Sequence, residues 1–345
     1  MREIDEGKIV GALLIDLSKA FDSVPHDQLL SELMNIGCGN NVLRWFHSYL
    51  SNRVQRVYER PDSTEWKMVS RGVPQGSGLS PLLFNIFVRD IPKLNDSDTR
   101  QYADDITHSD YGKTEHEVVG KLEKAFEATK QFCDNKGLVI NTEKTQFILM
   151  YAPGERIDNN IEILLGNVGV KPVKTVKLLG MTLDRYLSFG PHIDLMISKT
   201  NGLLGMLART AAMLPTSILR TVYISLIRSH LESCSGVWAS AASSHLHKLD
   251  IIQKRAARII LQKPRNTHAA PLQQILNLET LTTRRHRHIK HIVQQCLNNT
   301  YNPALDELFS WNANESCMSY NNKYRINIGR RRFENYAGEL IKDGI

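Results

Sequence analysis

Residues 101–109 read QYADDITHS, and this stretch decides the fold. Aromatic and β-branched residues on both sides of the Asp-Asp pair predict a β-hairpin with Asp104 and Asp105 near its turn. Two adjacent carboxylates repel one another, and a divalent cation relieves that repulsion. A solvated hairpin tip is the alternative reading, because Asp-Asp at a turn is common.

A third carboxylate, Asp16, lies at the end of an apolar, β-branched run at residues 9–17 that predicts one buried strand. An acidic group there is costly unless it is hydrogen-bonded, paired or bound to metal; capping of the following turn is the other possibility. If this strand and the hairpin are neighbours in one sheet, the three carboxylates converge. Oxygen ligands of this kind suit two Mg²⁺ ions, which about 3.5–4 Å apart would activate an attacking hydroxyl and stabilise a leaving oxygen in phosphoryl transfer.

The order of expected elements predicts an α+β fold for the first half of the chain. Strand, helix, two strands, helix and strand follow one another, as in a split β-α-β, ferredoxin-like sheet with helices on one face. A capping box at residues 114–117 and Gly137 delimit one of the helices. Beyond Leu183 the pattern becomes helical, with helices expected at 192–212, 216–231, 244–262 and 280–298. The predicted domains are 1–185, 186–300 and a basic, poorly patterned segment at 301–345.

Charge separates the two halves. Residues 1–180 carry 22 Lys and Arg against 25 Asp and Glu, a net charge of −3, whereas the whole chain of 345 residues carries +7, which leaves +10 for residues 181–345. A basic half predicts a polyanionic partner, with a solvated basic surface as the alternative. Lys254, Arg255 and Arg258 fall at helical spacings and so share a stripe. Arg284, Arg285 and Arg287 form a second basic cluster, for which an ordinary basic helix face is the alternative.

Cysteine usage and the N-terminus exclude several classes of protein. The five cysteines are scattered and form no C-x-x-C pair, which argues against a disulfide framework and a zinc module. The first residues, MREIDE, are charged and contain no apolar signal core. The sequence therefore predicts an intracellular protein that is not secreted, with the nucleus as a plausible compartment and no membrane partner.

Five motifs occur in order and carry a family resemblance: LLIDLSKAFDSVPHDQLL at 13–30, GVPQGSGLSPLLFNIFVRDIP at 72–92, YADD at 102–105, GLVINTEKTQF at 137–147 and KLLGMTLD at 177–184. Together they resemble the reverse transcriptase of non-LTR (LINE-like) retrotransposons, particularly jockey-like elements. The resemblance is strong over about residues 8–190 and weaker to about 290. It implies an RNA-directed DNA polymerase with a palm and partial fingers elements at 1–185 and a helical thumb at 186–300.

The resemblance implies roles for single residues. Asp16, with the Leu17 carbonyl beside it, and Asp104 match the metal ligands, and Asp105 matches the adjacent supporting carboxylate. The implied cofactor is a pair of Mg²⁺ ions, with Mn²⁺ as a substitute. Lys144 matches a lysine proposed to protonate the leaving pyrophosphate; on its own it reads as a surface lysine.

Further roles concern the substrates. Phe21 lies where the family places a steric gate against the nucleotide 2′-hydroxyl, and a core aromatic is the alternative. Gln75 and Gly76 match the loop that contacts nucleotide and template. Leu179 and Gly180 match the primer grip. The implied partners are an RNA template, a DNA primer and deoxynucleoside triphosphates.

The chain is expected to be partial, because family members carry a fingers region before the first motif and an endonuclease domain. Two functions therefore remain open: a nucleotidyltransferase, and a truncated, non-catalytic nucleic-acid-binding remnant. A maturase-like RNA-folding factor is a weaker third, since the jockey-like motifs extend past the palm. Primer extension with Mg²⁺ separates the first two.

Overall fold

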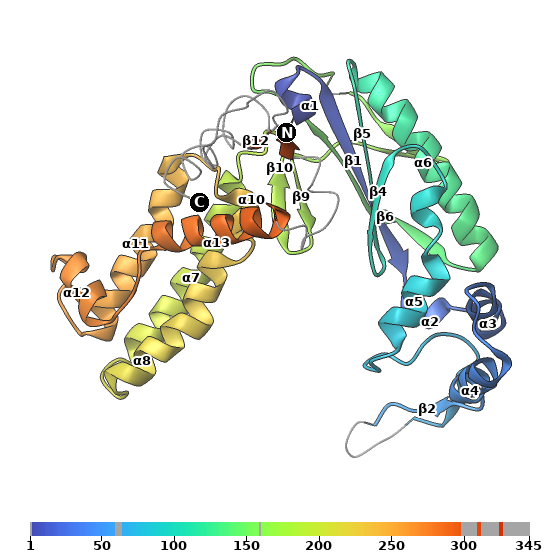
Figure 1. Ribbon diagram of the computed structural model, residues 1–345, viewed down its shortest axis with the longest axis horizontal. Coiled ribbons are helices and arrows are strands. Elements are labelled where there is room, and N and C mark those ends of the chain that lie inside the picture. Colours follow the sequence, from blue (N-terminus) through green and yellow to red (C-terminus); the bar gives the residue numbers. More distant parts are fainter. Residues whose placement is uncertain (1, 59–63, 159, 298–308, 312–323, 327–345) are drawn as a thin grey trace. The chain divides into compact units, whose positions relative to one another are not determined.

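The computed structural model describes residues 2–58, 64–158, 160–297, 309–311 and 324–326 (Figure 1). The chain forms two compact units, Lys8–Lys174 and Met1–Gly7 with Thr175–Ile345. The division falls after Lys174 rather than near residue 185, because the hairpin at 175–184 packs with the helices that follow it. Each unit is described by itself below.

A four-stranded antiparallel sheet is the centre of the unit Lys8–Lys174. Its strands lie in the order β4-β5-β1-β6, so that β1 is an inner strand between β5 and β6. The predicted strand at 9–17 and hairpin at 101–109 are thus sheet neighbours. The bounds are β1 Ile9–Ser18, β4 Asp98–Tyr102, β5 Asp105–Gly112 and β6 Val139–Met150. The smaller hairpins are β2 Val54–Gln55 with β3 Lys67–Met68, and β7 Ile163–Leu165 with β8 Val168–Val170.

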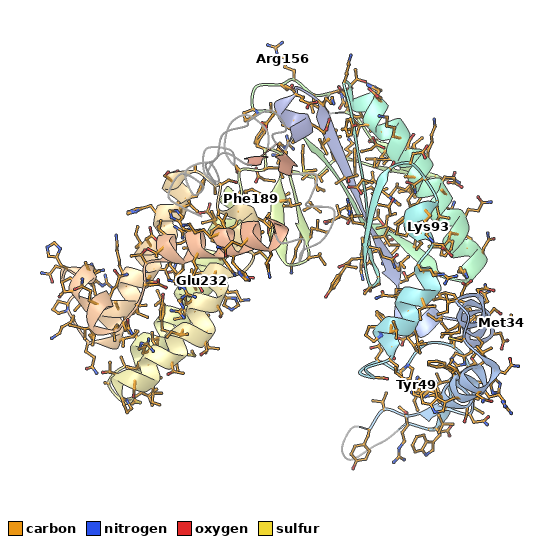
Figure 2. All side chains as sticks on the ribbon, viewed as in Figure 1. Met34, Tyr49, Lys93, Arg156, Phe189 and Glu232 are labelled. Atoms are coloured by element: carbon orange, nitrogen blue, oxygen red, sulfur yellow. The ribbon has the colours of Figure 1, made fainter. Side chains whose placement is uncertain are left out.

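Helix α6, Glu115–Lys136, packs on β1 and β5 and begins and ends where its capping residues predict. The hydroxyl of Thr114 accepts a hydrogen bond from the Glu117 N–H at 3.3 Å, and the Glu117 carboxylate accepts from the Lys113 N–H at 3.0 Å. Gly137 closes the helix in the left-handed region at φ 67. The remaining helices of the unit are α2 Ala20–Ser23, α3 His26–Asn35, α4 Asn40–Leu50, α5 Ser80–Val88 and the 3₁₀ turn η1 Ile91–Lys93. Met34 on α3 and Tyr49 on α4 are labelled in Figure 2.

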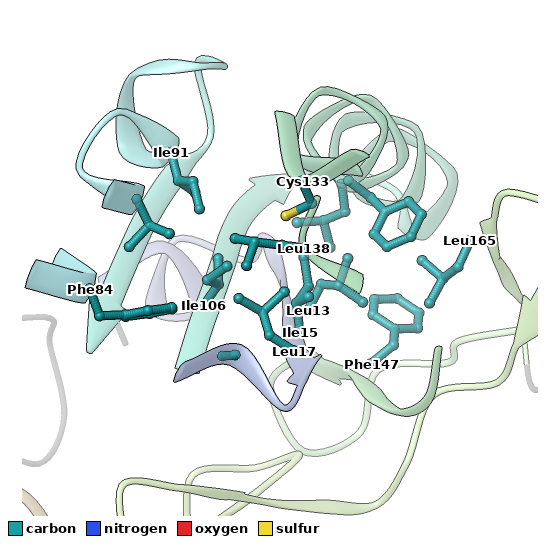
Figure 3. Packing of buried hydrophobic residues seen from close by; sticks show 14 of the residues in the cluster. Leu13, Ile15, Leu17, Phe84, Ile91, Ile106, Cys133, Leu138, Phe147 and Leu165 are labelled. Carbon is teal, nitrogen blue, oxygen red and sulfur yellow. The ribbon is translucent and has the colours of Figure 1, made fainter. Parts of the chain in front are cut away.

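Alternation along β1 separates a buried face of the sheet from a more open one. Leu13, Ile15 and Leu17 are at most 4% exposed and pack in one hydrophobic cluster with Phe84 of α5 and Cys133 of α6 (Figure 3). The residues between them, which include Asp16, point to the other face and are partly exposed. The α+β fold expected from the element order is confirmed, and its burial pattern aims Asp16 away from the core.

The second unit is mostly helical and contains all four helices expected from the sequence. One of them, expected at 216–231, is interrupted by a π-helical segment at Tyr223–Arg228. A second core surrounds Tyr223 and Trp238, both 0% exposed. The elements are α1 Arg2–Asp5, β9 Thr175–Leu178, β10 Met181–Asp184, α7 Gly190–Thr210, α8 Thr216–Val222, α9 Ser229–Glu232, α10 Ser235–Trp238, α11 Ser243–Ile260, α12 Ala269–Ile275, α13 Leu281–Leu297, β11 Phe309–Trp311 and β12 Tyr324–Ile326.

Most of the expected C-terminal segment at 301–345 lies outside the described residues. Among the helices that the structure describes, none combines the length and apolar character that crossing a membrane requires.

Candidate active site

The hairpin β4–β5 presents Asp104 and Asp105 at its turn, as the sequence predicts. Tyr102 pairs with Asp105, so the turn consists of Ala103 and Asp104. Ala103 adopts a left-handed φ of 55, which lets the chain reverse within two residues. Asp105 is therefore the first residue of β5, fixed in the sheet, while Asp104 stands at the tip.

Strand register brings Asp16 to the same place. Ile15 and Ile106 are the last pair of the β1–β5 register, and continuing this register by one step sets Asp16 opposite Asp105. The charge of Asp16 acts on Asp105 accordingly. Both isoleucines are buried, at 2% and 1% exposure, and alternation therefore points both aspartates to the opposite face of the sheet. Side chains directly opposite one another have Cβ atoms about 4.5–5.5 Å apart. The structure thus brings the three predicted carboxylates together at the ends of two neighbouring strands.

Electrostatics at these strand ends are unfavourable for the protein alone. Partial desolvation, and then the charges of Asp104 and Asp16, raise the pKa of Asp105 above its ordinary value of 3.8. Like charges directly opposite in a sheet are destabilising. The site consequently carries negative charge that a bound cation would neutralise.

The three carboxylates suit a divalent metal ion in their chemistry and in their position at the strand ends. Carboxylate oxygens are the hard ligands that Mg²⁺ and Mn²⁺ take. The side chains do not form a ready-made cage, since the described part of the chain holds no cluster of three or more His, Cys, Asp or Glu side chains arranged around one ion position. Leu17, whose carbonyl the resemblance implicates, is 4% exposed and pairs with Ile140 of β6.

A wide bulge in β6 brings Lys144 to the carboxylates. Leu14 pairs with Gln146 and Asp16 with Asn141, so two residue steps in β1 face five in β6. Bulges of this kind re-aim side chains beside functional sites. The Lys144 ammonium lies 3.9 Å from an Asp16 carboxylate oxygen, and its backbone N–H donates to the Asn141 side chain at 3.2 Å. The lysine side chain is 71% exposed, so this ion pair contributes little stability and leaves the ammonium available to another anion.

The loop at 72–78 is tied to the turn that follows β1. The Gln75 amide donates to the Asp22 carboxylate at 2.9 Å, and the Val73 N–H donates to the Phe21 carbonyl at 2.8 Å. Gly72 has a φ of 90 and lies so close to the Asp22 backbone that a Cβ atom would approach it within 2.7 Å. Gly76 also has a positive φ, 83, with open space around it. Gln75 and Phe21 are therefore held on one local scaffold.

The Phe21 side chain contacts the hydrophobic core and is also partly exposed. Its ring stacks on Phe84 with centroids 4.6 Å apart, and the side chain is only half-buried. Contact with the core fixes the ring, and its remaining surface is free to contact a ligand. Both roles considered for Phe21 are compatible with this placement.

Leu179 and Gly180 form the two-residue turn between β9 and β10. Both have positive φ values, 46 and 85, as in a type I′ hairpin turn. Leu179 is 55% exposed, so an apolar side chain stands at the hairpin tip. This hairpin belongs to the helical unit.

The first basic stripe lines a surface pocket of about 530 Å³ between α7 and α11. The Arg255 guanidinium donates to Asn201 at 2.8 Å and Arg258 to the Thr267 carbonyl at 2.8 Å, while Lys254 is partly exposed outside the pocket lining. Two further cations line this pocket, Lys263 and Arg265, which helical spacing alone did not single out. The two residues could have been found from the basic Gln-Lys-Pro-Arg stretch at 262–265, where the expected helix ends.

The three arginines of the second basic cluster differ in exposure. Arg285 is 3% exposed and lies 3.9 Å from Asp250, so it is part of the core. Arg284 forms ion pairs with Glu232 and Glu279 and is 28% exposed. Only Arg287 is well exposed, at 63%, and it pairs with Glu279. Arg285 is thus buried and Arg284 is ion-paired, but both line a pocket of about 480 Å³ together with Arg287 and Lys290. Their contact with a polyanion stays a prediction.

Comparison with known proteins agrees with the motifs. Residues 3–183 match the family described as "Reverse transcriptase (RNA-dependent DNA polymerase)". A probable RNA-directed DNA polymerase from transposon BS of Drosophila melanogaster is 28% identical over 84% of this chain and 33% of its own length. The RNA-directed DNA polymerase from mobile element jockey of the same organism is 28% identical over 74% of this chain and 28% of its own length. The chain spans about a third of these relatives, and the resemblance to jockey-like non-LTR elements is confirmed.

Among solved structures, apo telomerase from Candida tropicalis aligns with 82% of this chain and 46% of its own, at 13% identity and a TM-score of 0.41.

Proposed function

Because the chain belongs to the reverse transcriptase (RNA-dependent DNA polymerase) family, we propose that it carries the catalytic region of an RNA-directed DNA polymerase of a jockey-like non-LTR retrotransposon. The reaction is transfer of a deoxynucleotide from its triphosphate to a primer 3′-hydroxyl on an RNA template. The observation that carries the proposal is the register of β1 and β5, which sets Asp16 opposite Asp105 with Asp104 at the adjoining turn.

Asp16 and Asp104 would hold the divalent cations, and Asp105 would support them. When bound, two such ions polarise the attacking hydroxyl and neutralise charge on the leaving group. The carboxylates suit this task because partial desolvation and their mutual repulsion, which together raise the pKa of Asp105, leave the site in need of positive charge. Mg²⁺ is the expected ion.

Lys144 supplies a proton to the leaving pyrophosphate. Its exposed ammonium lies beside Asp16 on a bulge that the sheet itself holds in place. Gln75 and Gly76 position the nucleotide and template strand on the loop that Asp22 anchors, and the half-buried Phe21 ring excludes a ribose 2′-hydroxyl.

The helical unit contributes binding of the template–primer duplex. The pocket between α7 and α11 offers Arg255, Arg258, Lys263 and Arg265 to phosphates. Contacts of this type are sequence-independent and weaken steeply with salt. Leu179 at the β9–β10 turn contacts the primer.

The test is primer extension on an RNA template with Mg²⁺ and deoxynucleotides. We expect the chain alone to extend the primer slowly, and Asp104→Asn to abolish extension without reducing template–primer binding. Asp98→Asn is the matched control, because Asp98 is an exposed aspartate of the same hairpin that pairs with Arg100; it should extend normally. A protein that binds template–primer and never extends it is the non-catalytic remnant instead, and equal extension by Asp104→Asn overturns the catalytic assignment.

A further inference from the structure

We propose that α4 and the β2–β3 hairpin form a stacking surface for unpaired nucleotides of a single nucleic-acid strand. Its members are Trp45 and Tyr49 on α4 and Arg56 and Trp66 on the hairpin. None of them belongs to the polymerase chemistry described above. The inference rests on the proposed function in one respect, namely that the bound strand is the unpaired part of a template. Binding of a single strand by itself needs no catalysis.

Trp45 is an exposed aromatic ring that its neighbours hold in one orientation. It lies one helical turn before Tyr49, and the two rings stack with an interplanar angle of 8° and centroids 5.4 Å apart. Phe46 meets the Trp45 ring edge-on at 5.0 Å. Trp45 nevertheless remains 53% exposed. A large aromatic face is thus presented to solvent with little conformational freedom left to lose on binding.

This aromatic pair is joined to the loop of the candidate active site. The Tyr49 hydroxyl and the Ser77 hydroxyl are 2.7 Å apart, and Ser77 lies in the loop at 72–78 that also carries Gln75 and Gly76. Figure 2 shows Tyr49 on α4. The stacking surface therefore begins at the template-contacting loop of the proposed function and continues outward along α4.

The hairpin adds a second exposed aromatic ring beside a cation. Val54 pairs with Met68 and Gln55 with Lys67, and continuing this register sets Arg56 opposite Trp66. The Arg56 guanidinium carbon lies 4.6 Å from the Trp66 ring centroid. Trp66 is 60% exposed, and Val54 and Met68 on the same face are also exposed. Only residues 51–53 separate α4 from β2, so the connection spans no more than about 14 Å.

Charge identifies the occupant. Residues 40–71 contain six Lys and Arg and three Asp and Glu, a net +3, within a segment 1–180 whose net charge is −3. The rest of that segment therefore carries −6. Aromatic residues and Arg are also enriched at protein–protein interfaces, but the net positive charge of this segment within an acidic surrounding favours a polyanion. Aromatic platforms in a basic setting are typical of single-strand binding, where each ring stacks on one base. A duplex does not offer its base faces in this way.

The test uses the full chain, EDTA and no nucleotides, so that catalysis plays no part. Fluorescence anisotropy measures the affinity for a labelled single-stranded RNA of about 16 nucleotides, the upper site size of single-strand modules, and for a duplex of the same length. We expect Trp45→Leu and Trp66→Leu each to weaken single-strand binding about fivefold or more, as loss of a stacked base does. Duplex binding should change far less, and Trp45→Tyr should restore single-strand binding.

Tyr111→Leu is the matched control. Tyr111 is 45% exposed with the Lys8 ammonium 4.7 Å from its ring centroid, but it lies outside this surface, and its substitution should leave binding unchanged. Unaltered single-strand affinity in a folded Trp45→Leu, Trp66→Leu double variant overturns the inference. So does a change in sedimentation of that variant with unaltered RNA affinity, which would make the surface a protein interface. Loss of primer extension in Asp104→Asn bears on the proposed function alone, because that variant should still bind the single strand.

Discussion

His108 is a buried histidine whose substitution gives a quantitative test of the core of the unit Lys8–Lys174. It lies on β5, three residues after Asp105, at 0% exposure. Its ring nitrogens are 2.7 Å from the Thr99 hydroxyl and 2.9 Å from the Thr129 hydroxyl. A neutral ring, with one donor and one acceptor nitrogen, is fully satisfied by these two hydroxyls. His108 therefore links the hairpin β4–β5 to α6.

Burial lowers the pKa of His108 from 6.5 to about 4. Between these two values the unfolded chain binds a proton that the folded chain does not, so the free energy of unfolding falls as the pH falls through this window. The stability that the neutral His108 ring contributes is fully present above pH 6.5 and is lost by about pH 4. At 1.36 kcal/mol per pH unit, the interval from 6.5 to about 4 corresponds to about 3 kcal/mol.

The variant His108→Gln keeps a neutral donor and acceptor and removes the titration. Urea denaturation of both proteins over the window gives the difference in free energy of unfolding, in which the other titrating groups cancel. That difference, wild type minus variant, should fall by about 3 kcal/mol as the pH drops from 6.5 to about 4. A difference that stays constant across the window would show that His108 is not a buried neutral ring.

Three other expectations follow from the site. Asp105→Asn should raise the free energy of unfolding in EDTA, because the raised pKa of Asp105 means that its ionised carboxylate destabilises the fold. Urea denaturation should show this gain in stability at pH values above the raised pKa. The gain should disappear below pH 3.8, the ordinary pKa of the group. Phe21→Val should increase ribonucleotide use relative to deoxynucleotide use by about tenfold, the discrimination that a pocket contact supplies, measured by primer extension with each triphosphate. Arg255→Gln with Lys263→Gln should reduce the slope of log affinity for duplex against log salt by about one for each phosphate that the variant no longer neutralises, whereas the exposed, Glu279-paired Arg287→Gln should not.

Local signals predicted much of the fold. The capping residues Thr114 and Gly137 delimited α6 correctly, because cap geometry depends on a few neighbouring residues. The alternation of residues 9–17 likewise predicted β1. From the sequence it could only be assumed that the strand at 9–17 and the hairpin at 101–109 are neighbours, as the family resemblance implies. The register of β1 and β5 could not be predicted from the sequence and is known from the structure.

Non-local packing accounts for what was missed. The bulge that carries Lys144 depends on how β6 meets β1, and no residue pattern in β6 alone marks it. The unit boundary lies after Lys174 because β10 packs with α7, where Asp184 accepts a hydrogen bond from the Phe189 N–H at 2.8 Å.

The burial of Arg285 could have been predicted from the sequence. Leu281, Arg285 and Ile289 are spaced by four residues and so share one face of α13. That face is buried, since Leu281 and Ile289 are each 1% exposed. Grouping the arginines by charge ignored this apolar stripe.

The proposed polymerase function requires divalent cations at Asp16, Asp104 and Asp105, and one measurement tests this requirement independently of activity. Fe²⁺ bound in place of Mg²⁺ reduces added hydrogen peroxide to hydroxide and a hydroxyl radical, becoming Fe³⁺. The radical cuts the chain beside the ion, and mass spectrometry locates the cuts. We expect cuts near residues 16 and 104 that excess Mg²⁺ suppresses and that Asp104→Asn abolishes. Cuts elsewhere, or cuts at these residues that persist in Asp104→Asn, would contradict the assignment of these carboxylates as the metal site.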